Sequence, residues 1–571
     1  MKPKSRYLLV TLVALAAMVL PMLGSSPAVG VARAADTKTL TVAFPQEPDN
    51  LNYFYSNLSF AQWAVQLGTA ALWDYDEHLK AVPVLVAEVP TVANGGTSKD
   101  GKTTTIKLKK GLKWSDGEPL TADDVVFTYN MIKDKANNMA QGAQIQEAVD
   151  KAEKVDDVTV KLTTNTPQPY AENLAGSQNF NVLPAHILQP IYDKDKSIEK
   201  ADYNQNPTVF SGAYMLKEWK RGASMTWVVN PNYEGKKPSI ETLVLQFFPD
   251  PESAYAAFAA GQIDYVPNLQ PSDPPKIAGL TKNATFVNVY GGFRESLWLN
   301  VRTDKFPEAG HPALKDVRVR QAIRLGVNRR GLVKNLLGDA VPVAESLYAS
   351  SPFENKKLKF VEYDPAAAEK LLDAAGWVKG ADGVRESKGV PDVKDGTKLE
   401  LKYSTTPAAQ RKANQAVIQQ DLAKIGIKVT LENFPADNFF GQFKDGGITS
   451  GGKFDIAEYA NNTVTTNPAN ARVFFCDDIP SDAVPGGQNN VGYCNPKLDD
   501  LWKVTEQALD PAEGQKAADE IQTILAEDVP NIILYDRPDQ YTYNPTRFVG
   551  KPRIGAGLTN QWFDISNWQL K

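Results

Sequence analysis

Residues 106–132 read IKLKKGLKWSDGEPLTADDVVFTYNMI, and this stretch is the most informative in the chain for the fold. Apolar residues alternate with lysines as far as Trp114, which predicts a half-buried strand that breaks at the Lys110-Gly111 turn. A helix should then begin at Thr121, which suits an N-cap and is followed three residues later by Asp124 in the capping-box position. The physics of this stretch predicts a strand, a turn and a capped amphipathic helix.

The first 34 residues predict export. Three basic residues precede an apolar run over residues 8–23, and Ala32-Arg33-Ala34 supplies the small residues that a signal peptidase reads. The run contains Pro21 and is shorter than the roughly 20 residues that a membrane span needs. We therefore expect a signal peptide cleaved after Ala34, with an uncleaved anchor as the alternative.

Charge and length narrow the class of protein. Removal of residues 1–34 deletes four basic residues and no acidic one, so the formal net charge changes from −5 to −9. This balance argues against nucleic acid as the partner, because nucleic-acid binding favours a clustered basic surface. The remaining 537 residues exceed what one hydrophobic core usually holds, so we expect two or three domains.

The two cysteines, Cys476 and Cys494, lie in one loop-like stretch. In an exported protein this arrangement predicts a disulfide. The alternative, a metal site, is weak because the chain has only three histidines, His78, His186 and His311, each isolated in sequence. We interpret all three as structural or surface residues, and we expect neither a metal nor a cofactor.

Residues 96–103, GTSKDGKT, fit the phosphate-loop pattern G-x-x-x-x-G-K-[ST]. That motif needs a helix after it, so that backbone amides at the helix N-terminus face the phosphates. Here the alternating, β-branched TTTIKLKK follows instead. The segment is therefore predicted to be the turn of a β-hairpin, and nucleotide binding is not expected.

A search for catalytic constellations finds none. The sequence has no nucleophile elbow, no His-Glu-x-x-His motif and no Cys/His cluster. Adjacent carboxylates such as Asp123-Asp124 diverge from each other, and helix capping explains them. We therefore expect a protein that is not an enzyme.

Strands and helices alternate through both halves of the chain. Residues 399–434 show the pattern most clearly, because LELKYST, the helix QRKANQAVIQQDLAKIG and IKVTLENF make a β-α-β unit with parallel strands. This alternation predicts two α/β lobes rather than a barrel or a bundle. In open sheets of this kind ligands bind at the carboxyl ends of the strands, which between two lobes means the cleft.

Residues 110–127, KGLKWSDGEPLTADDVVF, resemble the hallmark of the peptide/nickel-type solute-binding proteins of ABC transporters, and the similarity continues along the rest of the chain. FSGAYMLKEW, residues 210–219, resembles the segment in which these proteins return from an inserted subdomain, with Gly212 as the hinge residue. The resemblance implies a two-lobe periplasmic-binding-protein fold of the large class. The expected division is a signal peptide at 1–34, lobe I at 35–58, 205–290 and 530–571, a subdomain inserted in lobe I at 59–204, and lobe II at 291–529.

The same resemblance implies the ligand-binding residues. In peptide receptors of this family a strand ends in Trp-x-x-Asp-Tyr, and its aspartate pairs with the ammonium group of the ligand. This chain has FDIAEY at residues 454–459, so Glu458 is expected in the carboxylate role, with a surface carboxylate that ends a strand as the alternative. The full expected ligand-binding set is Glu47, Asn50, Asn52, Trp298, Asn300, Glu458, Tyr459 and Asn461.

The resemblance implies an extracytoplasmic receptor of an ABC importer, which binds short peptides in the interlobe cleft and delivers them to permease subunits at the membrane. Receptors for oligosaccharides, nickel chelates or opines are the alternatives within the family, and an extracytoplasmic hydrolase or a sensor subunit is the alternative outside it. We expect a monomer that is periplasmic, secreted or at the cell surface. No cysteine near residue 34 offers a lipid-attachment site.

Overall fold

The computed structural model describes residues 37–56, 58–168, 174–177, 179–290, 293–302, 310–338, 341–349, 351–462, 472–484, 486–555 and 559–571. The expected signal peptide at residues 1–34 lies outside these ranges. Among the described residues, no helix is both long enough and apolar enough to cross a membrane.

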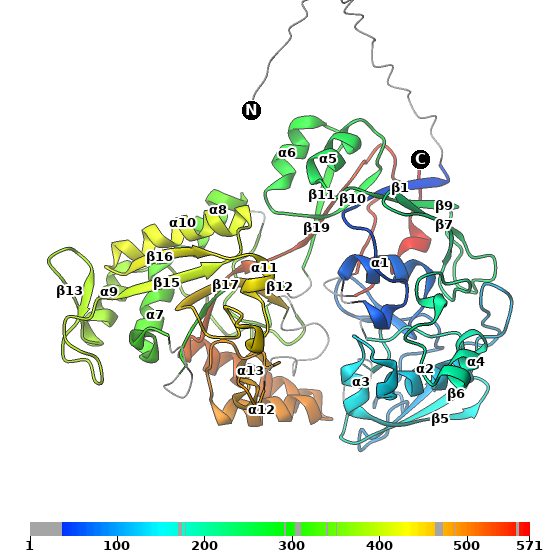
Figure 1. Cartoon of the computed structure of the whole chain (residues 1–571), viewed down its shortest axis with the longest axis horizontal. Helices are drawn as coiled ribbons and strands as arrows, with labels where there is room; N and C mark the ends of the chain where they lie inside the picture. Colours follow the sequence, from blue (N-terminus) through cyan, green and yellow to red (C-terminus); the bar gives the residue numbers. More distant parts are fainter. Residues whose placement is uncertain are drawn as a thin grey trace, which may run out of the picture. The chain divides into compact units, whose positions relative to one another are not determined.

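A seven-stranded mixed sheet forms the first lobe (Figure 1). Its strand order is β11 (Thr285–Val289), β19 (Asp539–Tyr543), β10 (Tyr265–Leu269), β1 (Thr39–Phe44), β9 (Thr242–Phe247), β8 (Ser224–Val229) and β7 (Tyr214–Lys220). Strand β1 is buried on both faces: Leu40 and Val42 pack into the large core, whereas Ala43 packs beneath α5 (Pro251–Ala259) and its neighbour α6 (Asp273–Leu280).

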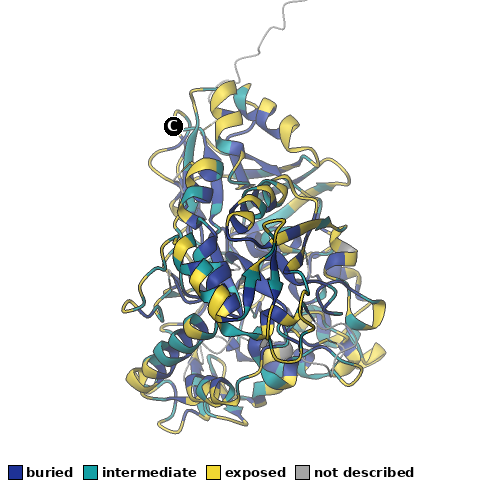
Figure 2. Ribbon diagram, turned by 90° about the vertical axis from the view of Figure 1, so that its left-hand side faces the viewer, coloured by how far each residue is buried: buried dark blue, intermediate teal, exposed yellow. Residues whose placement is uncertain are grey.

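A five-stranded mixed sheet forms the second lobe. Its order is β16 (Lys428–Asn433), β15 (Glu400–Thr405), β17 (Ile456–Asn462), β12 (Phe293–Leu299) and β18 (Asn531–Asp536). Leu297 and Leu299 face the core formed with α7 (Val317–Gly326), α8 (Arg329–Leu337), α9 (Pro365–Ala374) and α10 (Ala409–Lys424). Trp298 faces the other core, with α12 (Pro496–Gln507) and α13 (Pro511–Asp528). Figure 2 shows buried residues along the strands and exposed residues on the outer faces of the helices.

The sheet of the second lobe confirms the predicted β-α-β unit. Strands β15 and β16 pair in parallel from Glu400 opposite Lys428 to Thr405 opposite Asn433, with α10 between them in sequence. A two-stranded sheet of β13 (Trp377–Lys379) and β14 (Arg385–Ser387) and the short helix α11 (Ala436–Phe439) also belong to this lobe.

The opening stretch of the sequence lies in a three-stranded sheet with helices beside it. β4 (Thr103–Lys107), β6 (Thr159–Thr164) and β5 (Val149–Asp156) pair in that order, and α2 (Ala122–Lys133), α3 (Ala143–Ala148) and α4 (Ala185–Asp195) accompany them. The predicted capping box is confirmed, since the Thr121 side chain accepts a bond from the backbone of α2 and Asp124 accepts one from the Thr121 N–H at 2.9 Å. Trp114 is fully buried and belongs to the core.

The segment that mimics a phosphate loop is the turn of a hairpin, as predicted. The Ser98 N–H donates to the Thr103 carbonyl at 2.8 Å, and Gly101 supplies the positive φ of 68° that the turn requires. Strand β4 follows directly in sequence, where the phosphate-loop motif needs a helix.

Two passages of the chain connect the sheets, and they run side by side. β11 leads to β12 and β18 leads to β19, while β11 pairs with β19 in one sheet and β12 pairs with β18 in the other. The boundary expected at residue 530 is therefore wrong: β18 belongs to the five-stranded sheet, and the chain enters the seven-stranded sheet only after Asp536.

Gly212 has a packing role. A Cβ at this position would lie 2.8 Å from the Gly68 carbonyl carbon and from the Leu67 oxygen, at the end of α1 (Ser59–Gly68). The Gly212 N–H also donates to the Gly68 carbonyl at 2.8 Å. Close approach to α1 explains the glycine, and the hinge role stays a prediction.

The predicted disulfide between Cys476 and Cys494 is present and closes a loop with a sequence separation of 18. Because a cross-link of this length restricts the unfolded chain, we expect the double variant C476S/C494S to lose about 3 kcal/mol of stability. Chemical denaturation of the wild-type protein and of the variant measures the loss in the free energy of unfolding. The wild-type protein under reducing conditions should match the variant, and a variant as stable as the oxidised protein would contradict the prediction.

Candidate functional site

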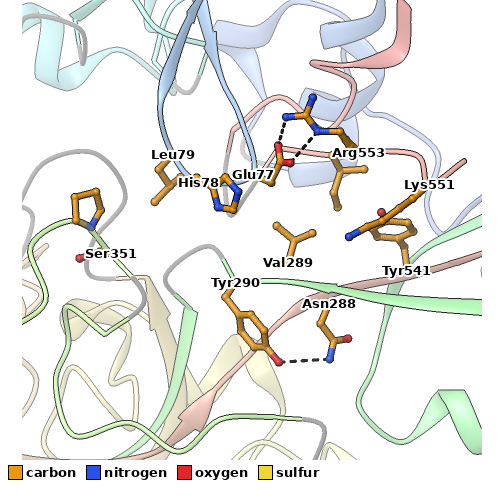
Figure 3. A pocket seen from close by; sticks show the side chains of 12 residues that line it. Glu77, His78, Leu79, Asn288, Val289, Tyr290, Ser351, Tyr541, Lys551 and Arg553 are labelled. Carbon is orange, nitrogen blue, oxygen red and sulfur yellow. Dashed lines mark hydrogen bonds and ion pairs between the residues drawn. The ribbon is translucent and has the colours of Figure 1, made fainter. Parts of the chain in front are cut away.

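A cavity of about 550 Å³ opens beside the two passages that connect the sheets (Figure 3). Residues from distant parts of the sequence line it: Glu77, His78, Leu79, Asn288, Val289, Tyr290, Ser351, Pro352, Tyr541, Lys551, Arg553 and Ile554. Its volume lies within the range of small-molecule sites, which is roughly 300–1,000 Å³. We therefore take this cavity as the candidate ligand site.

The turn between β2 (Trp73–Tyr75) and β3 (Ala81–Pro83) presents His78 to the cavity. The Asp76 carboxylate shapes this turn, because it accepts hydrogen bonds from the backbone N–H of His78 at 2.8 Å and of Lys80 at 3.0 Å. Leu79 completes the turn with a positive φ of 61°. A local Asp-centred turn thus fixes where the imidazole lies.

The cavity wall has more basic than acidic side chains, because Lys551 and Arg553 face a single carboxylate, that of Glu77. Arg553 donates two hydrogen bonds to the Glu77 carboxylate, at 2.8 and 2.6 Å, and this pairing lowers the Glu77 pKa. Lys551 is exposed and forms no ion pair or hydrogen bond with any residue in the described ranges. Lys551 and His78 are therefore basic groups that the cavity offers to an anion. Figure 3 shows the side chains of both residues at the cavity wall.

Polar and aromatic groups complete the wall. The Asn288 amide donates to the Tyr290 hydroxyl at 3.4 Å and accepts from the Gln540 amide at 2.6 Å, so two strands position it. Tyr290 is half-buried at the wall, Tyr541 adjoins it from β19 but is only 1% exposed, and Ser351 reaches the cavity from the second lobe. The site can therefore contact a ligand through charge, hydrogen bonds and aromatic faces at once.

The predicted ligand residues near the N-terminus stabilise a loop and do not line this cavity. Glu47 accepts from the Trp219 indole at 2.9 Å and from the Gly222 N–H at 3.0 Å. Asn52 caps a short 3₁₀ helix and donates to the Asn204 side chain at 2.8 Å, and Asn50 accepts from the Asn52 N–H at 2.7 Å.

The structure brings Trp298 and Tyr459 together but buries both. Their rings stack at 4.9 Å with a 10° angle between the planes, and the Trp298 indole donates to the Tyr459 carbonyl at 3.1 Å. Asn300 is also buried, since its amide donates to the carbonyls of Gly452 and Phe454, both at 2.8 Å. Asn461 is half-buried at the end of β17. These residues hold β12 and β17 together.

Glu458 is fully buried, so its interpretation as a surface carboxylate is wrong. The Tyr403 hydroxyl donates to it at 2.5 Å and the Asn414 amide at 2.7 Å. The carboxyl group does not line the cavity, and α10 covers the face of β17 on which it lies. Its role in anchoring an amine stays a prediction.

A buried ion pair lies next to Glu458. Arg411 donates to Glu295 at 2.7 Å, and both side chains are largely buried. Burial, and then the charge of Glu295, raise the pKa of Glu458 to about 8. At neutral pH Glu458 therefore keeps its proton and is a neutral hydrogen-bonding group.

None of the residues that line the cavity belongs to the ligand-binding set expected from the sequence. His78 was interpreted as a structural or surface residue, and the side chain is indeed exposed, but the same exposure places it on the cavity wall. The local signal that could have indicated it is the turn YDEHLK between two short strands. No local pattern connects His78 with Lys551, which is more than 400 residues away.

Comparison with known proteins identifies relatives along most of the chain. The family model described as "Bacterial extracellular solute-binding proteins, family 5 Middle" matches residues 81–480. The oligopeptide-binding protein AppA of Bacillus subtilis (strain 168) is 28% identical over 529 residues, which cover 89% of each chain. The nickel-binding periplasmic protein of Escherichia coli (strain K12) is 28% identical over 426 residues, 73% of this chain and 75% of the relative.

Solved structures show the same fold. The structure of AppA from Bacillus subtilis in complex with a nonapeptide superposes with a TM-score of 0.70 at 24% identity, covering 93% of this chain and 99% of that one. This likeness establishes the two-lobe α/β fold of periplasmic solute-binding proteins for the present chain.

The buried proton on Glu458 predicts a pH dependence. Because the folded-state pKa of about 8 exceeds the ordinary value of about 4.3, the folded protein binds an extra proton between these limits. Its free energy of unfolding should therefore fall as the pH rises from 5 to 8. The variant E458Q keeps a neutral group at all pH values and should remove of the order of 3 kcal/mol of that fall.

Denaturant titrations at pH 5 and pH 8 measure the effect. The matched control is E400Q, which neutralises an exposed carboxylate on the neighbouring strand β15 and should keep the wild-type pH dependence. An E458Q protein whose stability follows the wild-type pH profile would show that the carboxyl group is charged in the folded state.

Proposed function

This chain belongs to family 5 of the bacterial extracellular solute-binding proteins, and from this premise we propose that it is the receptor of an ABC importer for short peptides. A relative that is 28% identical over 529 residues is an oligopeptide-binding protein, which supports peptides as the ligand class. A dipeptide-binding protein of Escherichia coli (strain K12) is 25% identical over 531 residues.

The observation that carries the proposal is the place of the 550 Å³ cavity. Tyr290 and Tyr541 adjoin the two passages between the sheets, and Ser351 belongs to the second lobe. A ligand held there touches both lobes, so it stabilises the arrangement in which both sets of contacts form. Lobe I, its inserted subdomain and lobe II, which extends to Asp536, are the proposed moving parts.

The cavity suits one end of a peptide. Lys551 supplies positive charge for a carboxylate, and His78, Asn288 and Ser351 supply polar groups for the backbone. Asn461 is half-buried, and the bond from the Asn52 N–H uses only the side-chain oxygen of Asn50, so both residues stay candidates for further contacts. We assign Glu47, Asn52, Trp298, Asn300 and Tyr459 to the framework because they are engaged with other protein groups, and the amine-anchoring role of Glu458 stays a prediction.

The proposed biology follows from the class of protein. The receptor works outside the cytoplasm as a monomer after cleavage at Ala34, and it delivers its ligand to permease subunits in the membrane. It performs no chemistry on that ligand.

A second candidate ligand is a nickel chelate. A nickel-binding relative and the imidazole of His78 in the cavity favour it. Within the described ranges no group of three His, Cys, Asp or Glu side chains could hold a metal ion. A separate small-molecule chelator would therefore supply the ligands of the nickel ion, and the protein would bind the complete chelate.

Thermal-shift and calorimetric titrations separate these candidates. A pool of di- to nonapeptides should raise the melting temperature by mass action, whereas cello- or manno-oligosaccharides and Ni–histidine should not. Stabilisation by the oligosaccharides or by Ni–histidine alone would overturn the peptide proposal. Peptide fragments appearing during the titration would indicate a hydrolase.

A substitution at Lys551 tests how the cavity binds the peptide. Because its ammonium has no protein partner in the described part of the chain, removal of the charge should weaken only ligands with a free carboxylate. We expect K551Q to bind a peptide acid about tenfold more weakly, which corresponds to roughly 1.4 kcal/mol. The corresponding peptide amide should bind wild type and variant alike.

Isothermal titration calorimetry provides both affinities. K334Q removes an exposed charge on α8, outside the cavity, and serves as the matched control. If K551Q binds the acid as tightly as wild type, the carboxylate lies elsewhere even though peptides bind.

A further inference from the structure

A second cavity, of about 330 Å³, lies entirely within the first lobe and its subdomain. Its wall is built from the end of α1, the β2–β3 pair, the start of β7, the segment after β8 and the C-terminal segment. The polar groups that matter are Thr69, Asp74, Lys109, Tyr233, Lys236 and Asn560. None of them lines the cavity beside the passages between the sheets.

Asp74 gives this cavity a buried negative group. The residue is only 7% exposed, and its Oδ2 accepts a hydrogen bond from the Asn560 amide at 3.0 Å. The Ser177 hydroxyl lies near enough to favour the charged form, although the other carboxylate oxygen makes no hydrogen bond of standard geometry to the described residues. No lysine or arginine in the described ranges forms an ion pair with it.

The carboxylate is held in place. Strand β2 fixes the backbone of Asp74, and Asn560 is itself held because its side-chain oxygen accepts from the Trp562 N–H at 2.9 Å. Tyr233 lies near enough that the charge of Asp74, after burial, helps to raise its pKa to about 12. An unpaired buried carboxylate costs several kcal/mol, so a fixed one on a cavity wall is a candidate for a cationic ligand.

Two lysines supply the opposite charge. The Lys109 ammonium donates to the Val84 carbonyl at 2.6 Å, and the Lys236 ammonium donates to the Asn567 side chain at 2.5 Å. Each ammonium has three N–H donors, so both keep donors for a further acceptor. Neither pairs with a carboxylate in the part of the chain that the structure describes. The wall therefore combines one negative group with two positive groups.

We propose that this cavity binds a small zwitterion with a primary ammonium group, the class of a free α-amino acid. The ammonium pairs with Asp74, and the carboxylate pairs with Lys109 and Lys236. The volume stands at the lower end of the range for small-molecule sites, which excludes a long peptide. This site is independent of the peptide site proposed above, so either can fail without the other.

Calorimetric titration of the mature protein with L-alanine, ethylamine and propionate tests the proposal. L-Alanine should bind, and each probe with a single charge should bind at least tenfold more weakly. D74N preserves the shape of the side chain and its bond to Asn560, and it should weaken L-alanine at least tenfold while leaving peptide binding unchanged. D150N, on the exposed side of β5, is the matched control and should bind L-alanine as wild type does.

A pH titration of the wild-type protein tests the same claim without a variant. Burial raises the pKa of Asp74 to about 6, so the affinity for L-alanine should fall as the pH drops from 7.5 to 5. Three results would each overturn the proposal: no heat with L-alanine at millimolar concentration, equal affinity at the two pH values, or displacement of L-alanine by a peptide. The last result would place the amino acid in the other cavity.

Discussion

The pairing of the two chain passages between the sheets is the constraint on which the rest of the structure depends. On the side of the second lobe, Arg294 and Asp536 form a buried ion pair at 3.2 Å, and the Arg537 N–H donates to the Phe293 carbonyl at 2.8 Å. On the other side β11 and β19 continue as an antiparallel ladder. Few residues therefore separate the strands of one sheet from those of the other along both passages.

The core of the second lobe is held together by buried polar groups as well as by apolar packing. Glu458, Tyr403 and Asn414 form a hydrogen-bonded group between β17 and α10, beside the Glu295–Arg411 pair. Such a network is favourable only when each member is satisfied, and both carboxyl oxygens of Glu458 accept a hydrogen bond, one from Tyr403 and one from Asn414. The first lobe instead has charged side chains at cavity walls, among them Asp74, Lys109 and Lys551.

Local signals predicted local structure well. The capping box at Thr121, the turn at Gly101, the disulfide and the parallel β15–α10–β16 unit each depend on residues close together in sequence. The lining of the 550 Å³ cavity could not be predicted in the same way, because His78, Tyr290 and Lys551 come together only in the folded chain. The resemblance at residues 454–459 predicted a strand that carries Glu458, but it did not indicate that α10 covers the face of β17 on which this side chain lies.

The central claim is that the chain is a peptide receptor whose ligand lies where both lobes meet. Native mass spectrometry of the mature protein, followed by denaturation and fragmentation of the released ligand, tests this claim most directly. The account predicts a one-to-one complex from which a short, unmodified peptide is released. Release of an oligosaccharide or a metal chelate in its place would contradict it.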